Sequence, residues 1–130
     1  MSPLANDFVQ ALHSASIIFE HDADGTLRIP ARSSEIGDLI VSFDDDEITF
    51  FIGYITHQHF TPGACGNPEA PDQVAECIRG AVQFLRGMLD DRWVLYCCPN
   101  GGGGCYEIGE DGGWAKDAAR FVWSGPYRTQ

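Results

Sequence analysis

The segment GDLIVSFDDDEITFFIGYITHQHF, which spans Gly37–Phe60, decides the fold. Two largely apolar stretches, residues 39–43 and 48–52, flank an acidic run, Asp44–Glu47, and successive side chains of a strand point to opposite faces of a sheet. With a tight turn at Asp45 and Asp46, the residues brought opposite one another are Phe43 and Ile48, Val41 and Phe50, and Leu39 and Ile52. A slip of one residue would set Phe43 against Glu47 and lose most of that apolar surface. The segment therefore predicts an antiparallel hairpin with one wholly apolar face.

The rest of the chain supplies further hairpins and two helices. Ser2 and Pro3 are typical of a helix start, and apolar residues then recur at helical spacing. A second hairpin is predicted over residues 16–20 and 26–30, closed by a turn at Gly25, and Val74–Leu89 carries the apolar stripe of an amphipathic helix. Strands are predicted over residues 93–98, 105–108 and 119–123. We expect an α+β fold, with a mainly antiparallel sheet built from hairpins and packed by one long amphipathic helix and a short N-terminal helix, in a single domain over residues 1–130.

Composition narrows the classes of partner. The chain has 130 residues, 44% of them hydrophobic, and a formal net charge of -11 with only eight Lys and Arg residues. We expect no nucleic-acid binding, because phosphate contacts need a basic face, and a basic protein is the more natural partner. No basic leader with a following apolar run is visible, and no stretch approaches the roughly 20 apolar residues that span a bilayer, which predicts a cytoplasmic protein with no membrane segment. The five cysteines, an odd number, indicate reduced thiols rather than a disulfide framework.

The acidic run Asp44, Asp45, Asp46 and Glu47 is the first candidate site. Four carboxylates at a hairpin tip can meet Lys or Arg on a partner and accelerate association by electrostatic steering. A solvated turn that prevents edge-to-edge aggregation is the alternative.

His57 and His59 form the second candidate site. Two residues apart on a strand, both rings leave the same face and can share one zinc ion. Continuing the hairpin register would place Ser34 opposite His57 and Arg32 opposite His59, and neither is a good third ligand. A cysteine can complete such a site, and the candidates are Cys65, Cys97, Cys98 and Cys105. Histidines that bond to neighbouring backbone are the alternative.

Several short stretches carry a resemblance to other proteins. The residues concerned are Gly37–Val41, Asp45, Glu47–Thr49, Ile52–Gly53, Thr56–His57, His59–Phe60, Trp93–Tyr96 and the glycine run Gly101–Gly104. In these residues the chain resembles a group of small uncharacterised bacterial proteins, which implies a bacterial single-domain protein and brings no catalytic residues. In size, charge and layout it is also similar to immunity proteins that block toxins.

Three functional hypotheses follow. The first is a non-enzymatic protein-binding domain, as in an inhibitor or immunity factor, in which Asp44–Glu47 and the histidines face a basic partner. The second is a small zinc-dependent enzyme that uses His57 and His59. The third is a homo-oligomeric structural protein.

Overall fold

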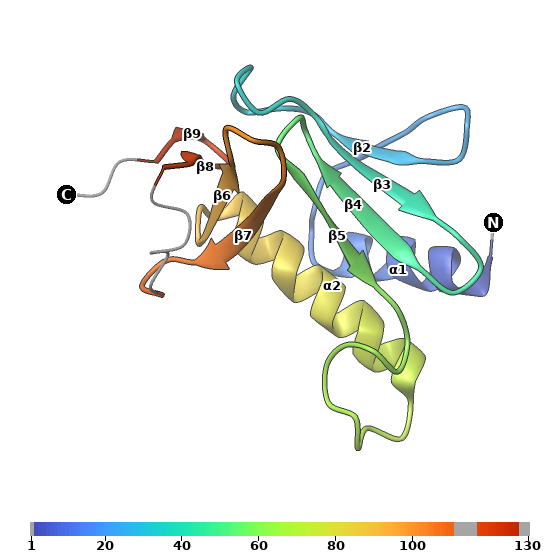
Figure 1. Ribbon diagram of the computed structural model, residues 1–130. Coiled ribbons are helices and arrows are strands. Elements are labelled where there is room, and N and C mark those ends of the chain that lie inside the picture. Colours follow the sequence, from blue (N-terminus) through green and yellow to red (C-terminus); the bar gives the residue numbers. More distant parts are fainter. Residues whose placement is uncertain (1, 111–116, 128–130) are drawn as a thin grey trace.

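The computed structural model describes residues 2–110 and 117–127, and within these ranges the chain forms two helices and two antiparallel sheets (Figure 1). In chain order the elements are α1 (Pro3–Ser14), β1 (Glu20–His21), β2 (Leu27–Ile29), β3 (Leu39–Phe43), β4 (Ile48–Ile52), β5 (Thr56–Phe60), α2 (Gln73–Leu89), β6 (Trp93–Cys97), β7 (Gly103–Glu107), β8 (Ala119–Val122) and β9 (Gly125–Pro126). The larger sheet has the order β1-β2-β3-β4-β5 and the smaller sheet the order β7-β6-β8-β9. The predicted α+β class is confirmed, with the strands divided between two sheets.

The β3–β4 hairpin, at the centre of the larger sheet, has the predicted register. The opposed pairs are Phe43 and Ile48, Val41 and Phe50, and Leu39 and Ile52. The turn is closed by the N–H of Asp44, which donates to the carbonyl oxygen of Glu47 at 2.9 Å. On the inner face all but Phe43 of these six side chains are fully buried, so the apolar face forms the floor of the core.

Both helices pack against this apolar face. α1 begins at the predicted cap, where the Ser2 hydroxyl accepts a hydrogen bond from the N–H of Ala5 at 3.2 Å. The ring centroid of Phe50 lies 5.9 Å from that of Phe8 on α1 and 6.0 Å from that of Phe84 on α2. Because both helices reach the same β4 side chain, they lie on one side of the larger sheet, and no described helix covers the other side (Figure 1).

α2 also supports the smaller sheet. Leu85 and Met88 belong to the same buried cluster as Leu95 of β6. Gly87 permits a close approach of the next element, since a Cβ at this position would lie 2.9 Å from the indole Nε1 of Trp93. One helix therefore joins two sheets that share no ladder (Figure 1).

The strand predicted over residues 16–20 is much shorter in the structure. Ser16 takes a left-handed φ of 58° directly after α1, which turns the chain out of the helix. Ile17 then enters the core, whereas Ile18 is 86% exposed. Pairing begins only at Glu20, which faces Arg28.

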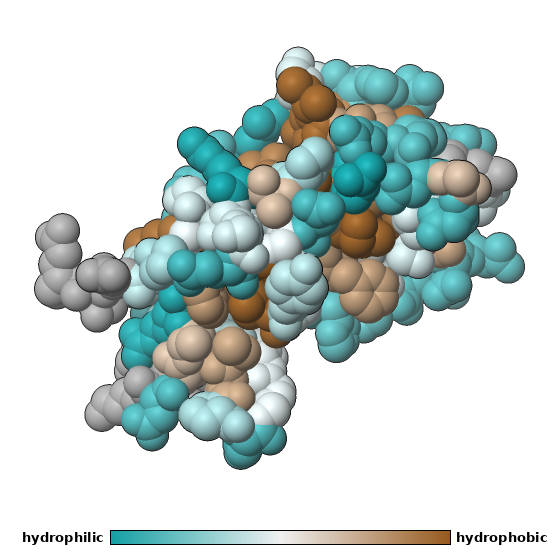
Figure 2. Space-filling view, turned by 90° about the horizontal axis from the view of Figure 1, so that it is seen from above, coloured by the Kyte–Doolittle hydropathy of each residue, from teal (hydrophilic) through white to brown (hydrophobic). Residues whose placement is uncertain are grey.

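Hydrophilic side chains cover much of the surface seen from above, and hydrophobic ones form smaller patches between them (Figure 2). Among the described helices, none combines the length and the hydrophobicity needed to cross a bilayer.

Candidate functional site on the uncovered sheet face

β5 carries both histidines and folds back along β4, which sequence reasoning did not anticipate. The prediction that Ser34 and Arg32 face the histidines was wrong, because Phe51 lies opposite His57 and Thr49 lies opposite His59. His57 and His59 do share one face, as predicted, and it is the face that the helices leave uncovered.

The reversal between β4 and β5 depends on a glycine. Gly53 has a φ of 53°, and a Cβ at this position would lie 1.7 Å from the carbonyl oxygen of Ile36. The N–H of Tyr54 donates to that same oxygen at 2.8 Å, which holds the turn against the preceding loop. A side chain at position 53 would therefore displace the turn that places the histidines.

His59 is held by the last residue of the acidic run. Its Nδ1 lies 2.6 Å from Oε1 of Glu47 and 3.0 Å from the hydroxyl of Thr49. The Thr49 hydroxyl also donates to Glu47 at 3.1 Å, and the Thr61 hydroxyl donates to the other carboxylate oxygen at 3.5 Å. These bonds, first that from His59, lower the pKa of Glu47. In the neutral tautomer that donates Nδ1–H to the carboxylate, Nε2 of His59 is an acceptor.

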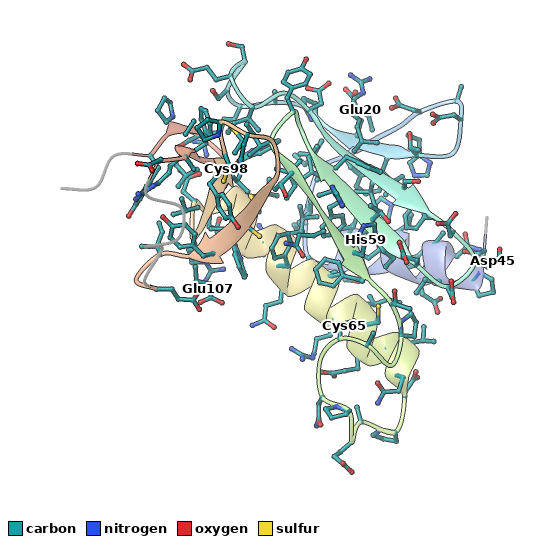
Figure 3. The ribbon with its side chains drawn as sticks, viewed as in Figure 1. Glu20, Asp45, His59, Cys65, Cys98 and Glu107 are labelled. Atoms are coloured by element: carbon teal, nitrogen blue, oxygen red, sulfur yellow. The ribbon has the colours of Figure 1, made fainter. Side chains whose placement is uncertain are left out.

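His57 lies beside this network without joining it. Its ring centroid is 4.9 Å from that of His59, at an interplanar angle of 78°. It also lies against Phe51, with 6.1 Å between the ring centroids and an interplanar angle of 39°. The two histidines therefore form an exposed pair on β5, the edge strand of the larger sheet, where Figure 3 labels His59.

The other three acidic residues of the run stand in solvent. Asp44, Asp45 and Asp46 are exposed at the β3–β4 turn, where Asp45 is labelled in Figure 3. Together with Asp24 of the β1–β2 turn and with Ser2 and Ala5 at the start of α1, they line a hollow of about 710 Å³, which therefore lies on the helix side of the tip. Sequence reasoning missed this convergence of two acidic turns, because it depends on β2 pairing with β3. The pKa of Asp24 is lowered by hydrogen bonds from the side chain and N–H of Thr26.

An apolar strip, formed by Ile40, Phe51 and the ring of His57, crosses the uncovered face of the larger sheet. Neighbouring strands place Ile40 opposite Phe51 and Phe51 opposite His57. Phe51 is 45% exposed, and Ile40 is half-buried. At the far end of the row Arg28 pairs with Glu20 at 2.7 Å. The sequence did contain the signal for Phe51, since an inward Phe50 requires its neighbour to point outward.

The candidate cysteine ligands lie elsewhere. Cys65 is in the loop after β5, and its thiol donates to the carbonyl oxygen of Thr61 at 3.3 Å. Cys97, Cys98 and Cys105 belong to the smaller sheet and its β6–β7 turn. Within residues 2–110 and 117–127 no three His, Cys, Asp or Glu side chains are grouped in a way that could hold a metal ion.

No protein-family model, curated protein or solved structure matches this chain.

Proposed function

We propose that this protein is a non-enzymatic binding domain that receives a basic protein on the uncovered face of its larger sheet. The feature that carries the proposal is the continuity of that face. Three features lie side by side along β3, β4 and β5 and the turn that joins β3 to β4. They are the exposed Asp44–Asp46 turn, the Glu47–His59 network and the strip around Phe51. An inhibitor or immunity factor is one form that such binding would take.

Charge supports a basic partner. The chain has a net charge of -11, and Asp24 lies near the three aspartates of the β3–β4 turn, around a hollow on the helix side of this tip. Such a concentration of one sign raises the rate of encounter with an oppositely charged protein and makes that rate sensitive to salt.

The apolar strip favours a stable complex after the first diffusional encounter. Aromatic residues are enriched at the centres of protein interfaces, where they bury large area against the partner. Phe51 and the two imidazoles supply aromatic surface beside the charged turn, which gives a central contact with a polar rim.

A pull-down with matched variants tests the proposal. The tip variant carries Asp44→Lys, Asp45→Lys and Asp46→Lys, and the control carries Glu35→Lys, Glu69→Lys and Glu110→Lys, three exposed carboxylates on other loops. Both variants change net charge equally. We expect a basic protein from the host cell to be retained by wild type and control but lost by the tip variant and weakened by Phe51→Ala. Retention of no protein, or equal retention by all variants, would refute the proposal.

A zinc site at His57 and His59 is the second candidate, favoured by one observation. Metal-bound histidines commonly donate their other ring nitrogen to a carboxylate, as His59 does to Glu47 at 2.6 Å. Metal analysis of untagged protein from zinc-replete cells separates the candidates. Zinc in the wild type that is lost in a His57→Ala, His59→Ala variant would favour this site, and zinc-free wild type would rule it out.

A further inference from the structure

A second recess lies on the opposite side of β5 from the histidines. It is a groove of about 500 Å³ between β5, α2 and the β6–β7 hairpin, in the size range of small-molecule sites. Gln58 and Phe60 line it, because they alternate with His57 and His59 and so point to the other face. Glu107, at the end of β7, stands on its rim (Figure 3).

Aromatic rings form the wall of this groove. The ring centroids of Phe60 and Phe84 are 5.5 Å apart, and those of Phe84 and Trp93 are 4.8 Å apart. Phe60 and Trp93 are each only partly buried, so ring surface remains open to the groove. The rings are inclined by 52° and 55° to one another, and a planar occupant can stack on one of their open faces.

A helical glycine keeps the groove open. Gly80 lies within α2 and lines the groove, and a Cβ there would meet no atom within 4 Å. Glycine inside a helix is unfavourable compared with alanine. The helix thus accepts an unfavourable residue at a position where packing would permit a larger one.

Two amides supply polar groups at the wall. The Nε2 of Gln58 donates to the sulfur of Cys105 at 3.1 Å, and no described residue donates to its Oε1. Gln83 accepts a bond from Arg79 at 3.0 Å through Oε1, and within the described ranges its NH₂ group has no acceptor. The groove therefore offers an acceptor and a donor to an occupant.

The charged residues that line the groove do not favour an anion. Arg92 and Glu107 both line it, and Arg92 already lies 3.7 Å from Asp90. In a chain of net charge -11, this arrangement favours an uncharged occupant over an anion. We propose that the groove binds an uncharged planar heteroaromatic molecule with adjacent donor and acceptor groups, of the kind found in nucleobases and nucleosides.

NMR titration of the full chain with adenosine, uridine and adenosine monophosphate tests this inference. We expect at least one nucleoside at millimolar concentration to shift the Trp93 indole N–H and the Gln58 side-chain amide, and the monophosphate to bind more weakly than adenosine. Bound nucleoside should also slow alkylation of Cys105 but not of Cys98, which lies away from the Glu107 end of the groove (Figure 3). The inference is overturned if neither nucleoside shifts these signals, or if the monophosphate binds as well as adenosine.

Two variants at one position provide the control. Gly80→Leu fills the groove and should weaken nucleoside binding by about tenfold or more, whereas Gly80→Ala adds one methyl group and should retain most of it. Gln58→Leu tests the groove independently, because it removes the Gln58 amide and should also weaken nucleoside binding. Unchanged affinity in both Gly80→Leu and Gln58→Leu would overturn the inference.

Discussion

Adjacent phenylalanines on β4 give the sharpest test of the hairpin register. Phe50 is fully buried and its ring centroid lies 5.3–6.0 Å from those of Phe8, Phe60 and Phe84, whereas Phe51 is 45% exposed on the other face. Replacing a buried Phe by Ala removes its transfer free energy and leaves a cavity, at a cost of about 3–5 kcal/mol. Phe51→Ala should cost about 1 kcal/mol or less, because much of that side chain already contacts water.

Urea denaturation followed by circular dichroism measures both free energies of unfolding. For a domain of this size the Phe50→Ala change corresponds to a fall in Tm of about 10–20 °C, against a few degrees for Phe51→Ala. Since a one-residue slip exchanges the two faces, a loss at Phe51 equal to or larger than that at Phe50 would show that the register is wrong.

Three further predictions concern two glycines, the Glu76 carboxylate and the Cys77 thiol. Gly53→Ala should destabilise the fold by several kcal/mol, because the added Cβ would lie 1.7 Å from a backbone carbonyl oxygen, whereas Gly80→Ala should stabilise the fold by about 1 kcal/mol. Thermal denaturation measures both effects, and similar Tm values for the two variants would contradict the packing described for these glycines. A hydrogen bond from Arg79, and a weaker contribution from a backbone N–H, lower the pKa of Glu76 to about 2. This carboxylate therefore stabilises the fold fully at a pH above its unfolded pKa of 4.5, and the stabilisation is lost as the pH falls through about 2. Denaturation of wild type and Glu76→Gln should differ near neutral pH and converge in acid; a constant difference would refute this. Burial raises the pKa of the Cys77 thiol to about 12, so Cys77 should resist alkylation by iodoacetamide at neutral pH until urea unfolds the chain. Mass spectrometry measures the labelling, and rapid labelling of Cys77 in the native protein would contradict its burial.

The β3–β4 hairpin could be predicted because its information is local. Two apolar stretches flank one acidic turn, and the observed register brings Leu39, Val41 and Phe43 together with Ile48, Phe50 and Ile52 on one face. The start of α1 was predictable for the same reason, since Ser2 and Pro3 act on the first turn that follows them.

The division into two sheets could not be read from the sequence, because it depends on contacts between distant segments. Gly103 illustrates this, since a Cβ there would lie 2.8 Å from the carbonyl oxygen of Ile55. The β6–β7 hairpin thus approaches the start of β5 closely without forming a ladder with it. A glycine within a run of four gives no indication of which distant backbone it meets.

The candidate site was predictable in its residues but not in its connections. Asp44–Glu47 and the histidines were identified from their spacing, yet the 2.6 Å contact between Glu47 and His59 requires β5 to fold back at Gly53. An isolated glycine among apolar residues does not distinguish such a reversal from a continuous strand. The tertiary contact with Ile36 makes the distinction.

β5 links the two proposed surfaces and also separates them. Its alternate residues place His57 and His59 on the uncovered face and Gln58 and Phe60 in the groove beside α2. A displacement of this strand by one residue would exchange the two sets, so both proposals depend on the turn at Gly53. Side-chain substitutions, in contrast, act on one face at a time. Loss of partner binding on tip reversal and loss of nucleoside binding in Gly80→Leu are therefore independent outcomes, and either can fail while the other holds.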